Sequence, residues 1–299
     1  MKQIRIEHDT HYMYERDVVL AQHLAYLRPR QDAWQRVLSS TLVVSPTADE
    51  IKEEKDAFGN ARTFFALTKP HRELLVKTCH LVEKRPRYEG FVACNTPSWD
   101  SLRAEMTYSL EQPFVAASEF VWQSPYVGWL PELKDYALPS FKKGRPIGEA
   151  VLDLCARIHA DFEYSTGSTE IHTPLAQAFS TRMGVCQDFS HIMIGCLRAV
   201  GLAARYVSGY LLTSPPPGEP RLRGADASHA WVSVYCPGVM GDWLDIDPTN
   251  KAIADTSHVV LAFGRDFGDV SPLRGVIRGG GEHTLRIAVT AEPLAEPAV

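Results

Sequence analysis

Hydrophobic and polar residues alternate through the first third of the chain, from residue 3 to about residue 83. Alternation with a period of two is typical of strands that bury one face. Turn residues such as Phe58-Gly59-Asn60 separate the alternating segments. Several short strands at this spacing favour an antiparallel β-sandwich. The expected strands are residues 4–12, 20–27, 37–44, 62–67 and 74–82.

The period changes in the second half of the chain. Apolar side chains recur at helical spacing over residues 147–162, and residues 174–181 predict another short helix. A third amphipathic helix is expected to begin at Cys186 and to end at Gly201. Helices followed by antiparallel strands make an α+β domain. The strands expected to follow these helices are residues 204–212, 230–235 and 243–246.

This change of period predicts an organisation in four parts. The segment before residue 146 is rich in proline and is expected to be a connector with short helical pieces. A last strand over residues 283–289 is expected to return to the N-terminal sheet, with a frayed tail from Ala291. The predicted parts are a β domain over residues 1–95, a connector over 96–145, an α+β core over 146–268, and a C-terminal strand and tail over 269–299.

Composition and charge exclude several classes of protein. Hydrophobic residues make up 45% and charged residues 22%, which disfavours disorder. The formal net charge is −5 and no dense run of Lys or Arg occurs, so no nucleic-acid partner is expected. No apolar stretch approaches the roughly 20 residues that span a bilayer, and no membrane partner is expected. The N-terminus lacks an apolar signal core, so a cytoplasmic location is expected.

The six cysteines are expected to be free thiols. They are far apart and contain no C-x-x-C pair, and a disulfide framework is disfavoured in a chain of 299 residues without a signal peptide. Cys79 lies in a strand-like run. The four in apolar surroundings, which are expected to be inert, are Cys94, Cys155, Cys196 and Cys236.

Cys186 differs because it stands at the start of a predicted helix, directly after a glycine turn. Unpaired N–H groups and the positive end of the helix dipole favour the thiolate, which is the nucleophilic form. His229 then opens an apolar strand, and Asp247 precedes a proline at the end of another. Thiol, imidazole and carboxylate are the three groups of a Cys–His–Asp nucleophilic site. Asp245, on the same strand face by alternation, is the alternative carboxylate.

These segments resemble the catalytic core of the transglutaminase-like superfamily, in its bacterial branch of cysteine proteases. Weaker resemblance extends to residues 6–14, 56–60 and 264–272, which match the flanking regions of that family. The resemblance implies a papain-like or transglutaminase-like core preceded by the family's N-terminal β domain. It also implies the catalytic triad Cys186, His229 and Asp247, and an acyl-enzyme intermediate. The core motifs read Gly-Val-Cys-Gln-Asp-Phe-Ser-His over 184–191, Ser-His-Ala-Trp-Val-Ser-Val-Tyr over 228–235 and Asp-Pro-Thr-Asn over 247–250.

The sequence therefore predicts a cysteine-dependent amide hydrolase that acts on a peptide or protein substrate and needs no cofactor and no metal. A protein-glutamine acyltransferase or deamidase is the first alternative, since it shares the acyl-enzyme, and a non-catalytic binding module is the second. A zinc site of Cys186, His191 and His229 is disfavoured by its ligand spacing. The backbone N–H of Cys186 is one expected oxyanion donor, and the second, Gln187 or Gln177, stays open.

The proline-rich loop that leads into His229 is expected to be an exposed rim. Proline lacks a backbone N–H and cannot join a sheet ladder, so the segment from Thr213 to Ser228 should stand beside the cleft as a wall. The natural substrate and the oligomeric state are not determined by the sequence.

Overall fold

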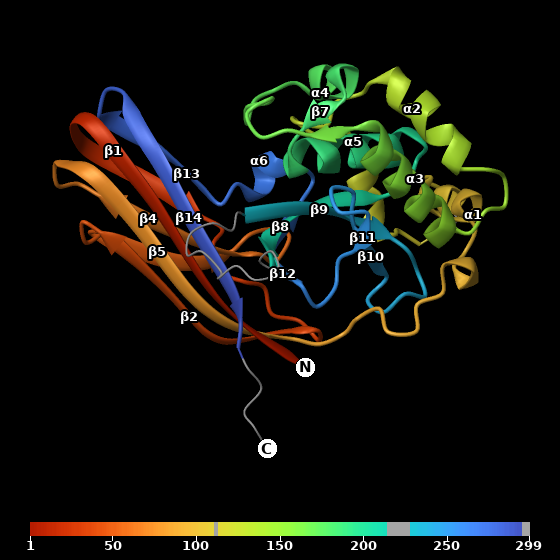
Figure 1. Cartoon of the computed structure of the whole chain (residues 1–299), viewed down its shortest axis with the longest axis horizontal. Helices are drawn as coiled ribbons and strands as arrows, with labels where there is room; N and C mark the ends of the chain where they lie inside the picture. The colour runs from red at the N-terminus through yellow and green to blue at the C-terminus, as the bar shows by residue number, and fades with distance from the viewer. Residues whose placement is uncertain (111–112, 214–227, 295–299) are drawn as a thin grey trace, which may run out of the picture.

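The computed structural model describes residues 1–110, 113–213 and 228–294, and the chain has the expected α+β class (Figure 1). A sheet of long strands forms one side of the molecule, and the helices form the other. A second antiparallel sheet, built from β8 to β12, lies between them. No helix in the described residues is long and apolar enough to cross a membrane.

The N-terminal part is one antiparallel sheet of seven strands in which β1 (Lys2–Ala25) pairs with four others. The first half of β1 pairs with β5 and β14, and the second half with β4 and β13. The pairing register shifts between Met13 and Val18, which marks a bulge where the strand changes partners. The other strands are β2 (Gln35–Ser45), β3 (Glu50–Lys55), β4 (Ala61–Leu67), β5 (His71–Lys84), β13 (Leu273–Gly279) and β14 (His283–Pro293).

The predicted sandwich is therefore a single bent sheet that packs on itself. Side chains such as Val18 of β1, Val44 of β2 and Phe65 of β4 form one buried cluster between its parts. The expected strands over 4–12 and 20–27 are both segments of β1, and β3 was not expected. The strand predicted over 283–289 does return to this sheet as β14. The expectation that the chain frays from Ala291 was wrong, because Ala291 is buried and pairs with Ile6 of β1.

The proline-rich segment before residue 146 contains short helices, as expected. These short helices pack into the molecule, since Trp99, Leu102 and Leu133 belong to the main hydrophobic core. The pieces are η1 (Ala93–Asn95), α1 (Trp99–Met106), η2 (Ala116–Val121), α2 (Pro131–Ala137) and η3 (Leu138–Ser140).

The core that follows places a buried helix against an antiparallel sheet. Helix α5 (Cys186–Ala199) packs on β8 and β9, and nearly all of its residues after the first turn are buried. The sheet order is β11-β10-β9-β8-β12, so β12 is an edge strand. The remaining elements are α3 (Ile147–Asp161), β6 (Glu163–Tyr164), α4 (Leu175–Thr181), β7 (Met183–Gly184), β8 (Ala204–Leu211), β9 (Ser228–Tyr235), β10 (Trp243–Asp247), β11 (Ala252–Ile253), β12 (His258–Gly264) and α6 (Phe267–Val270).

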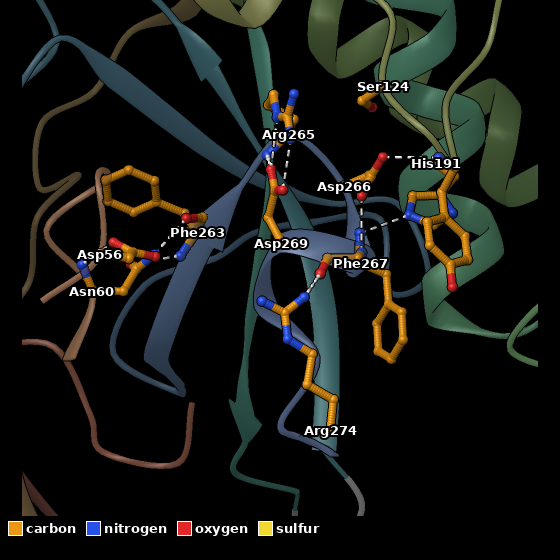
Figure 2. A network of polar contacts seen from close by, with 12 residues as sticks. Asp56, Asn60, Ser124, His191, Phe263, Arg265, Asp266, Phe267, Asp269 and Arg274 are labelled. Carbon is orange, nitrogen blue, oxygen red and sulfur yellow. Dashed lines mark hydrogen bonds and ion pairs between the residues drawn. The ribbon is translucent and has the colours of Figure 1, made fainter. Parts of the chain in front are cut away.

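The two sheets are joined through the outer edge of β12. The side-chain amide of Asn60 donates from Nδ2 to the carbonyl of Phe263 at 2.8 Å and accepts from its N–H at 3.0 Å (Figure 2). Gln35 makes the same two-point contact with Val260, at 2.7 and 2.8 Å. Both amides are buried. The turn over residues 56–60 thus satisfies the backbone of an edge strand that would otherwise lack partners.

Candidate active site

Cys186 is the first residue of α5, and the turn before it is shaped by Asp188. The carboxylate of Asp188 accepts hydrogen bonds from the Val185 N–H at 2.9 Å and from the Thr169 hydroxyl at 2.7 Å. Gly184 allows this approach, since a Cβ there would lie 2.6 Å from the Cβ of Asp188. The thiol is half-buried at the end of the helix where backbone N–H groups lack helical partners.

The structure brings the three predicted site residues together. The Nε2 atom of His229, on β9, lies 2.7 Å from Oδ2 of Asp247 at the end of β10. The imidazole also lies close to the Cys186 thiol, which helps to raise the pKa of the ring. Because Nε2 faces the carboxylate, the other ring nitrogen, Nδ1, is the one left to serve the thiol. Helix α5 thus supplies the thiol, and two adjacent strands supply the imidazole and the carboxylate.

Asp247 is completely buried, and its carboxylate accepts several hydrogen bonds. Oδ1 accepts from the backbone N–H groups of Thr249 at 3.0 Å and Asn250 at 3.2 Å. Oδ2 accepts from His229, from the Asn250 side chain at 2.7 Å and from Nε2 of His258 at 3.1 Å. The Asp-Pro-Thr-Asn turn therefore holds one oxygen of the carboxylate, and side chains hold the other.

Burial and hydrogen bonding oppose each other in setting the charges of this pair. Burial raises the pKa of Asp247, but the hydrogen bonds from His229, His258 and Asn250 outweigh it and hold the pKa well below its usual range. Burial lowers the pKa of His229, but hydrogen bonds to Asp247 and Cys186 outweigh it and raise the pKa to about 10. The arrangement thus favours a carboxylate and an imidazolium at neutral pH.

Asp245, the alternative carboxylate, lies outside the site. It pairs with Arg87, whose Nη1 lies 3.2 Å from Oδ2 of Asp245. Arg87 in turn stacks on Trp34 and donates to the carbonyl of Trp243. Asp245 therefore serves the packing of residues 85–90 against the core sheet, two residues away from the carboxylate that contacts His229.

Two side chains that the sequence analysis did not select complete the surroundings of Asp247. Trp231 is fully buried, with its ring 5.1 Å from that of His258 in an edge-to-face contact and 6.2 Å from that of His229. Gly209, opposite His229 on β8, leaves the space that Trp231 fills, because a Cβ there would lie 2.5 Å from the indole. His258 carries a signal in the sequence: like His229, it follows a serine and opens an apolar strand.

Neither glutamine is shown to be an oxyanion donor. The side chain of Gln187 donates to the carbonyl of Ile171 at 3.0 Å, so it is engaged elsewhere, and Gln177 lies exposed on α4.

Tyr164 and Tyr206 lie near Cys186. Burial raises the pKa of both phenols, and the negative charge of a Cys186 thiolate raises it further. The proline-rich rim over residues 214–227 falls outside the described residues.

The predicted zinc alternative is not assembled. His191 accepts a hydrogen bond from the Phe267 N–H at 3.2 Å, and burial lowers its pKa to about 4 (Figure 2). The one group in the described part of the chain with three possible metal ligands within 4.8 Å of one another is His229, Asp247 and His258. Its ligand atoms are the same atoms that hydrogen-bond to each other, and this fits a proton-sharing cluster.

The other five cysteines differ in exposure, and Cys79 is half-buried. Cys155, Cys196 and Cys236 are buried, as expected, and burial raises the pKa of each thiol, in Cys155 and Cys236 to about 12. Cys94 was expected in apolar surroundings but is exposed, because the short helix η1 places it on the surface. Exposure alone would therefore make Cys94 the most reactive thiol.

Comparisons with known proteins show the family of the chain. The bacterial transglutaminase-like N-terminal region matches residues 4–83, and the transglutaminase-like superfamily core matches residues 135–248. An uncharacterized protein of Mycobacterium tuberculosis is 38% identical over 283 residues, which cover 94% of this chain and 89% of its own length. The chain belongs to the transglutaminase-like superfamily.

Two further comparisons cover very different shares of the chain. The solved structure of a candidate cysteine protease from Cytophaga hutchinsonii superposes with a TM-score of 0.75 at 21% identity, over 100% of this chain and 92% of its own, so the two share a fold. A protein-glutamine gamma-glutamyltransferase of Pseudomonas aeruginosa is 39% identical over 72 residues, which are 24% of this chain and 10% of that protein.

Proposed function

We propose that the protein is a cysteine-dependent hydrolase of peptide-like amides, in which Cys186, His229 and Asp247 form the catalytic triad. The observation that carries the proposal is the hydrogen bond from one imidazole to a buried carboxylate, made by a ring whose pKa is also raised by the nearby thiol at the start of helix α5. A structural histidine needs no such pair of partners, whereas general-base activation of a thiol requires both.

The first half of the reaction forms an acyl-enzyme. The Cys186 thiolate attacks the amide carbonyl carbon, and the C=O electrons move onto oxygen as the C–S bond forms. The Cys186 backbone N–H, in the first helical turn, is the proposed donor to that oxyanion. As the C–N bond breaks, Nδ1 of the His229 imidazolium gives its proton to the leaving nitrogen. The amine departs and a thioester remains.

The second half resolves the thioester with water. Neutral His229 takes a proton from the water as its oxygen attacks the carbonyl carbon, and the C–S bond then breaks. The products are a carboxylic acid and the Cys186 thiolate beside a protonated ring. Throughout both halves Asp247 accepts the Nε2–H hydrogen bond and stabilises the imidazolium.

Acyl transfer to an amine is the alternative outcome of the same thioester. A primary amine in place of water would give a new amide. The similarity of 72 residues to the Pseudomonas aeruginosa gamma-glutamyltransferase supports this alternative. With glutamine side chains as substrates, water would give deamidation and an amine would give cross-linking.

A panel of peptides tests the proposal. Some peptides contain only backbone amides and others also contain glutamine side chains, and each is incubated with and without a primary amine. Mass spectrometry would follow the acyl adduct on Cys186 and the products. The proposal predicts a carboxylic acid product whose yield is little changed by the amine. Cys186→Ala, which removes only the sulfur nucleophile, is the control and should form no adduct.

Two other results would redirect the account. Products that incorporate the amine would assign the protein to the acyltransferases. The absence of any adduct across the panel, with Cys186 unreactive toward small electrophiles as well, would favour a binding module.

A further inference from the structure

We propose that His258 is a positioning residue that holds the Asp247 carboxylate in place for His229. The inference rests on the proposed function, since it assigns His258 a part in activating the same thiol. His258 begins β12, the edge strand at the far side of the sheet from β10, so no backbone pairing brings it to Asp247. The contact is made by its side chain alone.

The carboxylate needs this donor because it is buried. Oδ2 of Asp247 accepts from Nε2 of His229 at 2.7 Å and from Nε2 of His258 at 3.1 Å, and the two rings lie 6.0 Å apart. Asp247 has no exposed surface, so protein donors must replace water around it. His258 and Asn250 are the side chains that flank the oxygen on which His229 depends.

The hydrogen-bond pattern also determines the tautomer of His258. An ionised Asp247 can only accept, so His258 must carry a proton on Nε2. Its Nδ1 atom is buried and has no hydrogen-bond partner among the described residues. The contact with Asp247 is therefore the one polar interaction that this ring makes in the described structure.

Packing fixes the ring in the orientation that the contact requires. Trp231 lies against it edge to face, and His258 is 6% exposed. The titratable groups that face it are Asp247 from β10 and His229 from β9, while the carbonyl of Asp255 holds its backbone N–H at 2.9 Å. Asp247 and His258 are both buried, so solvent has little access to replace a lost donor at this contact.

The pH dependence of Cys186 alkylation by iodoacetamide tests the inference without a substrate. The pH at which the rate reaches half its maximum reports how strongly the imidazolium stabilises the thiolate. His258→Phe keeps a ring but removes the donor, and should raise this midpoint by about one pH unit. At pH values below the midpoint, alkylation of Cys186 should then be roughly tenfold slower. His258→Gln keeps an N–H donor near the position of Nε2 and should restore the midpoint.

His80→Phe is the matched control, because His80 is a buried histidine with one side-chain hydrogen bond, to Ser40, in the N-terminal sheet. It should lower the melting temperature without moving the midpoint. If His258→Phe also lowers only the melting temperature, His258 is structural and the inference is wrong. If His258→Gln shifts the midpoint as far as His258→Phe, the donor is not what matters. A wild-type midpoint equal to that of an ordinary thiol would instead contradict the proposed function itself.

Discussion

At the scale of residues, the site depends on which of two neighbouring aspartates contacts the imidazole. Asp247 faces His229, and Asp245 faces Arg87. The two side chains have the same chemistry and lie two residues apart on β10. They therefore form a matched pair in which position alone separates the carboxylate that contacts His229 from the one that pairs with Arg87.

Asp247→Asn is expected to slow alkylation of Cys186 near neutral pH by at least about tenfold, the change in thiolate that one pKa unit gives. A neutral amide cannot stabilise imidazolium and presents a donor to a ring nitrogen that also donates. Asp245→Asn should leave that rate unchanged and lower the free energy of unfolding by about 1–3 kcal/mol, because it weakens a buried ion pair. The opposite pattern would show that Asp245 is the carboxylate of the site.

Cys186, His229 and Asp247, which the structure brings together, could be selected from the sequence because each lies in a motif with a recognisable local structure. The contact between His258 and Asp247 could not be predicted in this way. His258 is 11 residues beyond Asp247 on a strand that does not pair with β10, so no periodicity relates the two. Its role becomes visible only when the sheet is folded.

At the scale of elements, β8 carries a glycine, Gly209, directly opposite His229 of β9. A Cβ on Gly209 would lie 2.1 Å from the carbonyl of Val259 and 2.5 Å from the Trp231 ring. The first contact is with backbone, which cannot move aside without disturbing the pairing of β8 and β12.

Gly209→Ala is therefore expected to lower the free energy of unfolding by about 1–3 kcal/mol, as overpacking does. It should also slow Cys186 alkylation, because Trp231 packs on both histidines of the site. Urea unfolding and the alkylation rate measure the two effects. Gly128→Ala is the control, since a Cβ there meets nothing within 4 Å and should change stability by no more than about 0.5 kcal/mol. Equal effects of the two substitutions would show that the close contact at Gly209 relaxes freely.

The strands and helices of the core were largely predictable, and the length of β1 and the presence of β3 were not. A period of two locates a strand but does not show whether two segments are joined by a bulge, as at Met13 to Val18. Strand β3 is exposed along most of its length, so it has no buried face to produce an alternating pattern.

At the scale of the whole molecule, the N-terminal sheet covers the edge of the sheet that carries the site. The buried cluster between them includes Ile4 and Ile6 of β1 with Tyr210 of β8 and Leu261 of β12. The amides of Gln35 and Asn60 then satisfy the backbone of β12. The periodicity of a local segment does not predict contacts between distant segments. The sequence of the turn over residues 56–60 therefore gives no sign that Asn60 binds β12.

Asn60→Ala is expected to lower the free energy of unfolding by about 2–4 kcal/mol, because it leaves both backbone groups of Phe263 without the partners shown in Figure 2. Chemical denaturation measures the loss. Asn95→Ala removes an exposed asparagine and should change stability by no more than about 0.5 kcal/mol. An Asn60 variant as stable as the Asn95 variant would mean that the two sheets are held together by their apolar contacts alone.

The central claim is that His229 activates the Cys186 thiol, and limiting iodoacetamide tests it most directly. The pKa of His229 is raised to about 10, so the ring keeps its proton across neutral pH and can stabilise the thiolate beside it. The difference in alkylation rate between Cys186 and the other cysteines should become smaller as the pH rises toward 10, because His229 loses that proton and exposed thiols ionise as well.

Peptide mapping after brief alkylation near neutral pH would rank all six cysteines in one protein. Half-buried Cys186 is expected to react before exposed Cys94, and His229→Ala is expected to reverse this order. If Cys94 reacts first in the wild-type protein, or if the order survives loss of His229, exposure alone governs these thiols and the claim is contradicted.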